Sequence, residues 1–124
     1  MNVCCKADQT EENFFIVGTK NGSLTLKAKC ADGSEKTLHS LYDPEAEART
    51  LVNAFEFEGK GILVVLGLGL GYHVAELAGR FTDAEIVVIE AYPEIHKLAR
   101  EHGPVIDGRV RFITGCTPQD ALRQ

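Results

Sequence analysis

A short glycine-rich stretch is the part of the sequence best suited to bind a nucleotide. Residues 64–77 read VVLGLGLGYHVAEL, so an apolar run leads into Gly67, Gly69 and Gly71 and then into a helical pattern. Strand, glycine turn and helix in this order are the plan of a mononucleotide-binding βαβ unit. Gly67 would allow a tight turn, Gly69 would let the backbone approach a ligand, and the helix would offer free N–H groups.

A carboxylate stands at the position where such a unit binds a ribose. Glu90 ends the next apolar run, 19 residues after Gly71, and could accept both ribose hydroxyls. The dinucleotide fingerprint G-x-G-x-x-G would need glycine where Tyr72 stands, so a pyrophosphate site is not indicated. The looser G-x-G-x-G followed by an acid resembles motif I of class I S-adenosylmethionine (SAM) methyltransferases. That resemblance implies SAM or another adenosine or nucleotide ligand as the cofactor.

The same residues also have a purely structural interpretation. Glycines at a strand–helix turn can serve close packing alone, and Glu90 could be a solvated acid at a strand end. His73 could donate a hydrogen bond to a ligand carboxylate or phosphate, or it could be a partly exposed helix residue without a special role. No pattern of nucleophile and base, or of metal ligands, involves the scattered residues His39, His96 and His102. We therefore predict no catalytic residue and no metal site.

Composition limits the class of protein and its partners. The chain has 124 residues, enough for one domain, and a net charge of −5, which argues against nucleic acid as a partner. The longest apolar run, residues 62–70, is interrupted by glycines and is too short to span a bilayer, so no membrane partner is expected. The first residues carry no signal-peptide pattern, and the four cysteines are expected to be reduced thiols. These features predict a cytoplasmic location.

Hydrophobic patterns divide the chain into three segments. Residues 1–40 predict an antiparallel β-meander, residues 41–60 a connecting helix, and residues 61–124 a partial Rossmann-like nucleotide-binding half, an incomplete domain. In the third segment strand and helix patterns alternate, which predicts three parallel strands in the order 3-2-1. The expected fold class is α/β, with an N-terminal antiparallel β-meander beside a partial Rossmann-type parallel sheet.

Finer patterns place the individual elements. In the second meander strand, buried apolar residues should alternate with exposed polar ones such as Thr25. Asp43 should cap a helix over about residues 44–57, with Leu51 and Phe55 on its apolar stripe. The run at residues 62–66 is apolar throughout, as expected for a strand covered on both faces. The meander strands themselves are expected near residues 13–19, 23–30 and 35–40.

Three stretches together resemble the N-terminal domain of motility accessory factor proteins, large bacterial proteins of the flagellin-glycosylation system. Members of that family read L-H-S-x-Y-x-P-x-x-E-A, then a strand ending in G-x-G-L-G-Y-H, then a strand ending in I-E-P. Ala91 here replaces the usual proline. The resemblance extends over about residues 13 to 116. It is carried by Leu38, His39, Ser40, Tyr42, Pro44, Glu47 and Ala48, by Gly67, Gly69, Leu70, Gly71, Tyr72 and His73, and by Ile89 and Glu90.

This resemblance implies an accessory domain. In the family, glycosyl transfer is attributed to a following domain that resembles sialyltransferases and uses CMP-activated nonulosonic acids. The chain would then be an accessory N-terminal Rossmann-like domain of such a glycosyltransferase, with a vestigial or partial nucleotide site. The parent protein would be the transferase, and this chain alone would lack a complete active site.

A second resemblance is to spermidine synthase and its methyltransferase-like relatives. They too have a small β-meander before a Rossmann unit, and their third parallel strand usually ends in G-D, whose Asp holds the adenine amine. Here Gly115 and Cys116 occupy those positions, so the acid is missing. This alternative implies the cofactor-binding half of a SAM-dependent methyltransferase or of an aminopropyltransferase-like enzyme.

The combined patterns give a set of candidate cofactor-binding residues and leave a third function open. Without a fourth strand, residues 62–66 would present an unpaired apolar edge, which soluble proteins avoid. The chain is therefore expected to form a homodimer or to pack on the remainder of a larger protein, and it could be a small self-associating protein without catalysis. The candidate cofactor-binding residues are Gly67, Gly69, Gly71, Tyr72, His73, Glu90, Ala91 and Cys116.

Overall fold

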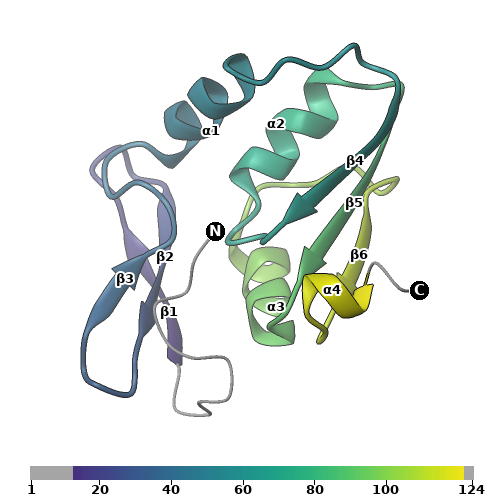
Figure 1. Cartoon of the computed structure of the whole chain (residues 1–124). Helices are drawn as coiled ribbons and strands as arrows, with labels where there is room; N and C mark the ends of the chain where they lie inside the picture. The colour runs from purple at the N-terminus through teal and green to yellow at the C-terminus, as the bar shows by residue number, and fades with distance from the viewer. Residues whose placement is uncertain (1–12, 122–124) are drawn as a thin grey trace.

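The computed structural model describes residues 13–121 and has an α/β fold with two three-stranded sheets (Figure 1). The first sheet is the expected antiparallel meander, in the order β1-β2-β3. Its third strand is shorter than expected, because the chain leaves the sheet after Thr37. The strands are β1 (Asn13–Gly18), β2 (Leu24–Lys29) and β3 (Glu35–Thr37).

The second sheet is parallel, and its order confirms the 3-2-1 prediction. Its strands β4, β5 and β6 pair in the order β4-β5-β6, with Leu66 opposite Ile89 and Glu90 opposite Thr114. The carboxyl ends of all three strands therefore lie at one edge of the sheet, where a Rossmann half binds its ligand. The strands are β4 (Gly61–Leu66), β5 (Ala84–Glu90) and β6 (Arg111–Thr114).

Four helices connect or follow the strands. Asp43 caps the first helix as expected, since its side chain accepts a hydrogen bond from the Ala46 N–H at 2.9 Å. Arg109 anchors the far end of the second helix by donating hydrogen bonds to the carbonyls of Ala78, Phe81 and Ala84. The helices are α1 (Pro44–Asn53), α2 (Tyr72–Arg80), α3 (Pro93–His102) and α4 (Pro118–Ala121).

One hydrophobic cluster joins the meander, the helices and the parallel sheet. Figure 1 shows α2 and α3 between the meander and the parallel sheet, with α1 beside α2. Leu26 of β2, Val52 of α1 and Leu63 of β4 all belong to this cluster. The meander therefore packs at the end of the Rossmann-like part, near the carboxyl ends of its strands, and does not pair with β4.

Several sequence-based expectations are wrong in detail. The first helix ends at Asn53, so Phe55 lies outside it, stacks on Phe57 and is exposed, as is Leu51. Thr25 was expected to face solvent, but it is fully buried, and its hydroxyl has no hydrogen-bond partner among the described residues.

The largest difference concerns β4, which is covered on one face only. Leu63 is buried against the helices, whereas Ile62, Val64 and Leu66 on the opposite face are 62%, 47% and 52% exposed. The short helix α4 packs on β5 and leaves these three residues open. The continuous apolar run of β4 therefore does not mean that both of its faces are covered within residues 13–121.

The cysteines also differ from expectation. Cys30 is disulfide-bonded and Cys116 is a free thiol, so the prediction of four reduced thiols is wrong for Cys30. Disulfides persist mainly in oxidising compartments, so the Cys30 disulfide does not support a cytoplasmic location. That location stays a prediction. Among residues 13–121, none of the helices has the length and apolar character needed to cross a membrane.

Candidate functional site

The three glycines of the predicted site adopt backbone conformations that other residues rarely adopt. Gly67, Gly69 and Gly71 have φ angles of 93°, 57° and 96°, all in the left-handed region. Between them, Leu68 and Leu70 turn their side chains into the core and are fully buried. The glycines therefore let the chain alternate between tight turns and buried leucines while it passes from β4 into α2.

Glu90 contacts this glycine loop directly, as the sequence predicts, but it binds the loop backbone. Its Oε1 accepts a hydrogen bond from the Leu68 N–H at 2.8 Å, and its Oε2 accepts one from the Tyr92 N–H at 3.1 Å. The residue is only 3% exposed, so the alternative interpretation, a solvated acid at a strand end, is wrong. The carboxylate that would hold a ribose is already bonded to its own chain on both oxygens.

A histidine from a distant segment of the chain accepts a hydrogen bond from a second N–H group of the loop. His39 Nε2 accepts a hydrogen bond from the Leu70 N–H at 2.7 Å, across 31 residues of sequence. Two other loop amides are bonded to backbone: the Gly67 N–H donates to the Ile89 carbonyl, and the Gly71 N–H donates to the Leu68 carbonyl. The N–H groups of Gly67, Leu68, Leu70 and Gly71 are thus engaged within the chain and are not free to bind a phosphate.

Close packing around the loop explains why Gly69 and Gly71 carry no side chain. A Cβ atom added to Gly69 would lie 2.3 Å from His39 Nε2, and one added to Gly71 would lie 2.8 Å from Ile106 Cδ1. On α3, a Cβ atom at Gly103 would lie 2.0 Å from the Leu70 carbonyl oxygen. The glycines therefore serve the close packing that the sequence left as the alternative to ligand binding.

Burial governs the titration of the groups around the loop. Burial raises the pKa of Glu90, although hydrogen bonds from the Leu68, Tyr92 and Gly69 amides partly oppose the shift. Burial, together with the nearby His73, lowers the pKa of His39 to about 4. His39 is therefore neutral near pH 7, which leaves its Nε2 free to accept the Leu70 N–H.

Tyr72 and His73, which follow the glycines, also make contacts within the chain. The Tyr72 hydroxyl donates a hydrogen bond to the Leu24 carbonyl and so ties α2 to the meander. His73 is half-buried, and its Nε2 lies 3.1 Å from the Gly67 carbonyl oxygen. Burial lowers the pKa of His73, which favours a neutral ring that donates to this carbonyl.

The last two predicted residues lie at the same edge of the sheet without joining the loop. Ala91 is exposed and directly follows Glu90. The Gly115 N–H donates a hydrogen bond to the Glu90 carbonyl at 3.1 Å, which places the half-buried Cys116 next to the end of β5. The structure thus gathers the eight predicted residues around the carboxyl ends of β4, β5 and β6.

The segment that carries His39 is itself held by a small hydrogen-bond network. The Ser40 hydroxyl accepts hydrogen bonds from the Tyr42 and Asp43 N–H groups, and the Ser40 N–H donates to Glu47 at 3.0 Å. These bonds stabilise a turn between β3 and α1 and hold His39 against the glycine loop. No catalytic or metal-binding pattern in the sequence involves His39, although it lies within the L-H-S stretch of the family resemblance.

The arrangement can do little chemistry in this conformation. Its buried ionisable side chains Glu90 and His39 accept hydrogen bonds from backbone donors, so neither is free to exchange a proton with a substrate. Among the described residues, no group of three or more His, Cys, Asp or Glu side chains is placed to hold a metal ion. The geometry suits a rigid junction better than a reaction centre. It joins the glycine loop, the end of β5 and the segment that carries His39.

Comparison of the chain with models of known protein families finds no match, and comparison with curated proteins finds no match either.

A double-mutant cycle should detect the contact between Gly69 and His39. Gly69→Ala should lower the free energy of unfolding by about 2 kcal/mol more than Gly22→Ala, because both have a positive φ but only Gly69 has a neighbour within 4 Å. In a His39→Ala background this difference should disappear. Urea denaturation of the parent, the three single variants and the two double variants measures it, and strictly additive losses would contradict the proposed contact.

The buried histidines should make the fold sensitive to acid. The pKa of folded His39 is about 4, below its ordinary 6.5, so the unfolded chain takes up the proton first. The free energy of unfolding should therefore fall as the pH drops from 6.5 to 4, by up to ~3 kcal/mol for this residue. His73 adds to this loss, whereas the raised pKa of Glu90 acts in the opposite direction.

Urea denaturation at a series of pH values tests this expectation. His39→Gln should flatten the pH dependence between 6.5 and 4, because the group that gains the proton on unfolding is gone. His102→Gln is the matched control, since His102 is exposed at the end of α3 and should leave the profile unchanged. An identical profile for His39→Gln and the parent chain would show that His39 is not the acid-sensitive group.

Proposed function

We propose that this chain is an accessory Rossmann-like domain of a glycosyltransferase that resembles the motility accessory factors, and that it contributes a binding surface instead of catalysis. One observation carries the proposal: the Leu68 and Leu70 N–H groups of the glycine loop are bonded to Glu90 and His39 of the same chain. A loop in this state is a vestigial nucleotide site that now serves as a structural junction. The parent protein, on this proposal, holds its active site elsewhere.

The contact pattern within the chain supports the family resemblance. The L-H-S stretch and the G-L-G-Y-H stretch, which carry that resemblance in sequence, touch each other through His39 and the Leu70 N–H. Ser40 and Glu47, which belong to the same resemblance, hold that contact in place. Residues that stabilise one another are expected to occur together, so the shared pattern has a physical reason.

The open side of β4 supports a role in assembly. Its residues Ile62, Val64 and Leu66 form an exposed apolar row, and β4 pairs with β5 on one side only within residues 13–121. Soluble proteins seldom leave such an edge uncovered. We propose that the remainder of the larger protein covers it in the working molecule, in the cytoplasm and without nucleic acid or membrane.

A second candidate function rests on the topology at the carboxyl edge of the sheet. Glu90 at the end of β5, Gly115 at the end of β6 and the glycine loop lie together there, as in the cofactor half of a SAM-dependent methyltransferase or an aminopropyltransferase-like enzyme. Binding of an adenosine ligand would require Glu90 and His39 to release the loop amides. This function is therefore favoured only if the loop opens in solution.

Titration with S-adenosylhomocysteine and with CMP separates the two candidates. If the site is vestigial, neither compound at millimolar concentration should shift the NMR signals of residues 67–71 in the folded chain. If the loop opens, an affinity of ~0.1 to 1 mM is expected, because half of the usual contacts are missing. Shifts confined to the loop and abolished by Glu90→Gln would overturn the accessory role in favour of the cofactor half.

The isolated chain should also self-associate through β4. An unpaired apolar edge of this kind favours a symmetric homodimer, so light scattering at tens of micromolar should give about twice the monomer mass. Val64→Lys should restore the monomer, whereas Leu51→Lys, at an exposed apolar position on α1, should not. If the unsubstituted chain stays monomeric, the exposed row on β4 no longer supports a role in assembly.

A further inference from the structure

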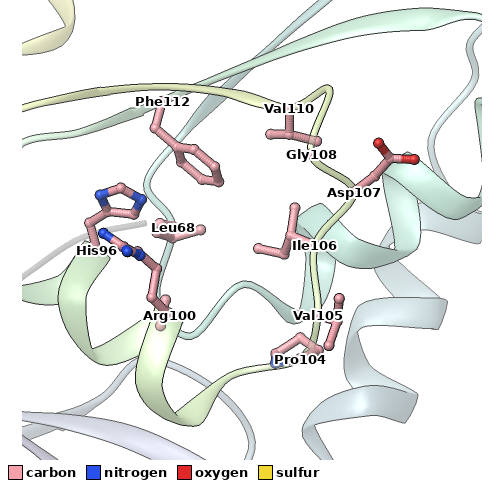
Figure 2. Close-up of a pocket in the computed structure, with 11 residues that line it drawn as sticks. Leu68, His96, Arg100, Pro104, Val105, Ile106, Asp107, Gly108, Val110 and Phe112 are labelled. Carbon is pink, nitrogen blue, oxygen red and sulfur yellow. The ribbon is translucent and has the colours of Figure 1, made fainter.

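A hollow on the surface lies outside the predicted cofactor site. The proposed function does not involve it. It lies between α3, β6 and residues 104–108, and it encloses about 510 Å³, within the range of small-molecule sites (Figure 2). None of the eight residues predicted to bind a cofactor lines it. Leu68, whose backbone belongs to the loop, contributes its side chain to the wall of the hollow.

The inner surface of this hollow is apolar and partly aromatic. Leu68, Ala99 and Val110 are buried, and Phe112 and Ile106 face each other across the open space (Figure 2). The His96 ring stacks on Phe112, with ring centroids 4.6 Å apart and an interplanar angle of 29°. A flat ring could insert between Phe112 and Ile106 and continue this stack.

The rim of the hollow carries one cation, Arg100, that has no partner among residues 13–121. Arg100 lies one helical turn after His96 on α3, is exposed, and makes no ion pair or hydrogen bond with any residue between 13 and 121. Across the hollow, Asp107 is already engaged, because it accepts the Arg109 N–H at 2.9 Å and lies 3.6 Å from Arg109 Nε. The available charge at the rim is therefore positive.

We propose that this hollow binds a small planar aromatic molecule that carries one anionic group. The ring would lie between Phe112 and Ile106 over the apolar floor, and the anion would pair with the Arg100 guanidinium, which matches both carboxylate and phosphate in geometry. Burial, with the neighbouring Arg100, lowers the pKa of His96, so this imidazole is neutral at pH 7 and serves as a stacking surface. Recognition would then come from shape and from a single charge.

NMR titration of the folded chain tests the proposal with defined probes. Indole-3-acetate supplies an aryl carboxylate, phenyl phosphate supplies an aryl phosphate, and indole supplies a neutral ring. We expect at least one of the two anions to shift the signals of Ile106, Val110 and Phe112 with a Kd of ~0.1 to 1 mM, and indole to bind about tenfold more weakly. The preferred anion identifies the chemistry that Arg100 selects.

Two variants on α3 decide whether Arg100 makes the selection. Arg100→Gln should weaken binding of the preferred anion about tenfold and leave indole unchanged, because only the ion pair is removed. Lys97→Gln removes an equal charge from an exposed position of the same helix outside the hollow, so anion binding should stay within about twofold of the parent chain. Absence of shifts at the lining residues with both anions, or equal losses in the two variants, would overturn the proposal.

Discussion

The hydrogen bonds that Glu90 and His39 accept from the Leu68 and Leu70 amides are the constraint on which the molecule depends. A glycine-rich turn exposes backbone donors, and a buried donor without an acceptor costs about 1–3 kcal/mol. In a nucleotide-binding protein the ligand can supply the acceptors. Here the acceptors are two buried side chains of the same chain, 22 and 31 residues away in sequence. Each bond therefore ties a separate structural element to the end of β4.

This constraint explains the arrangement of the meander. His39 can reach the loop only if the chain leaves β3 early and turns through Ser40 before α1 begins. The meander is then held near the carboxyl ends of the parallel strands, where the Tyr72 hydroxyl binds the Leu24 carbonyl and Phe14 packs on Tyr92. The meander therefore lies at the end of the parallel sheet and not along β4. The exposed row on β4 is the consequence.

The two candidate surfaces differ in what they offer to other molecules. The β4 row is exposed and apolar, and the strand edge that no residue of 13–121 pairs with suits pairing with another protein segment. The hollow beside α3 is concave, with an aromatic wall and, at its rim, Arg100, which no described residue pairs, so it suits a small charged molecule. The glycine loop offers neither a free edge nor an open cavity, because its neighbours fill the space around it.

The sequence by itself determined the element types, the strand order and the gathering of residues at the carboxyl edge, because local periodicity and turn chemistry control them. The left-handed glycines and the position of Glu90 at the end of β5 follow from those patterns. Only the tertiary structure decided that His39 contacts the loop, that one face of β4 is open within residues 13–121, and that Arg100 lies beside a hollow with no ion-pair partner in that range. These features arise from contacts between segments far apart in the chain, and periodicity carries no information about which distant segment supplies an acceptor or leaves a face uncovered.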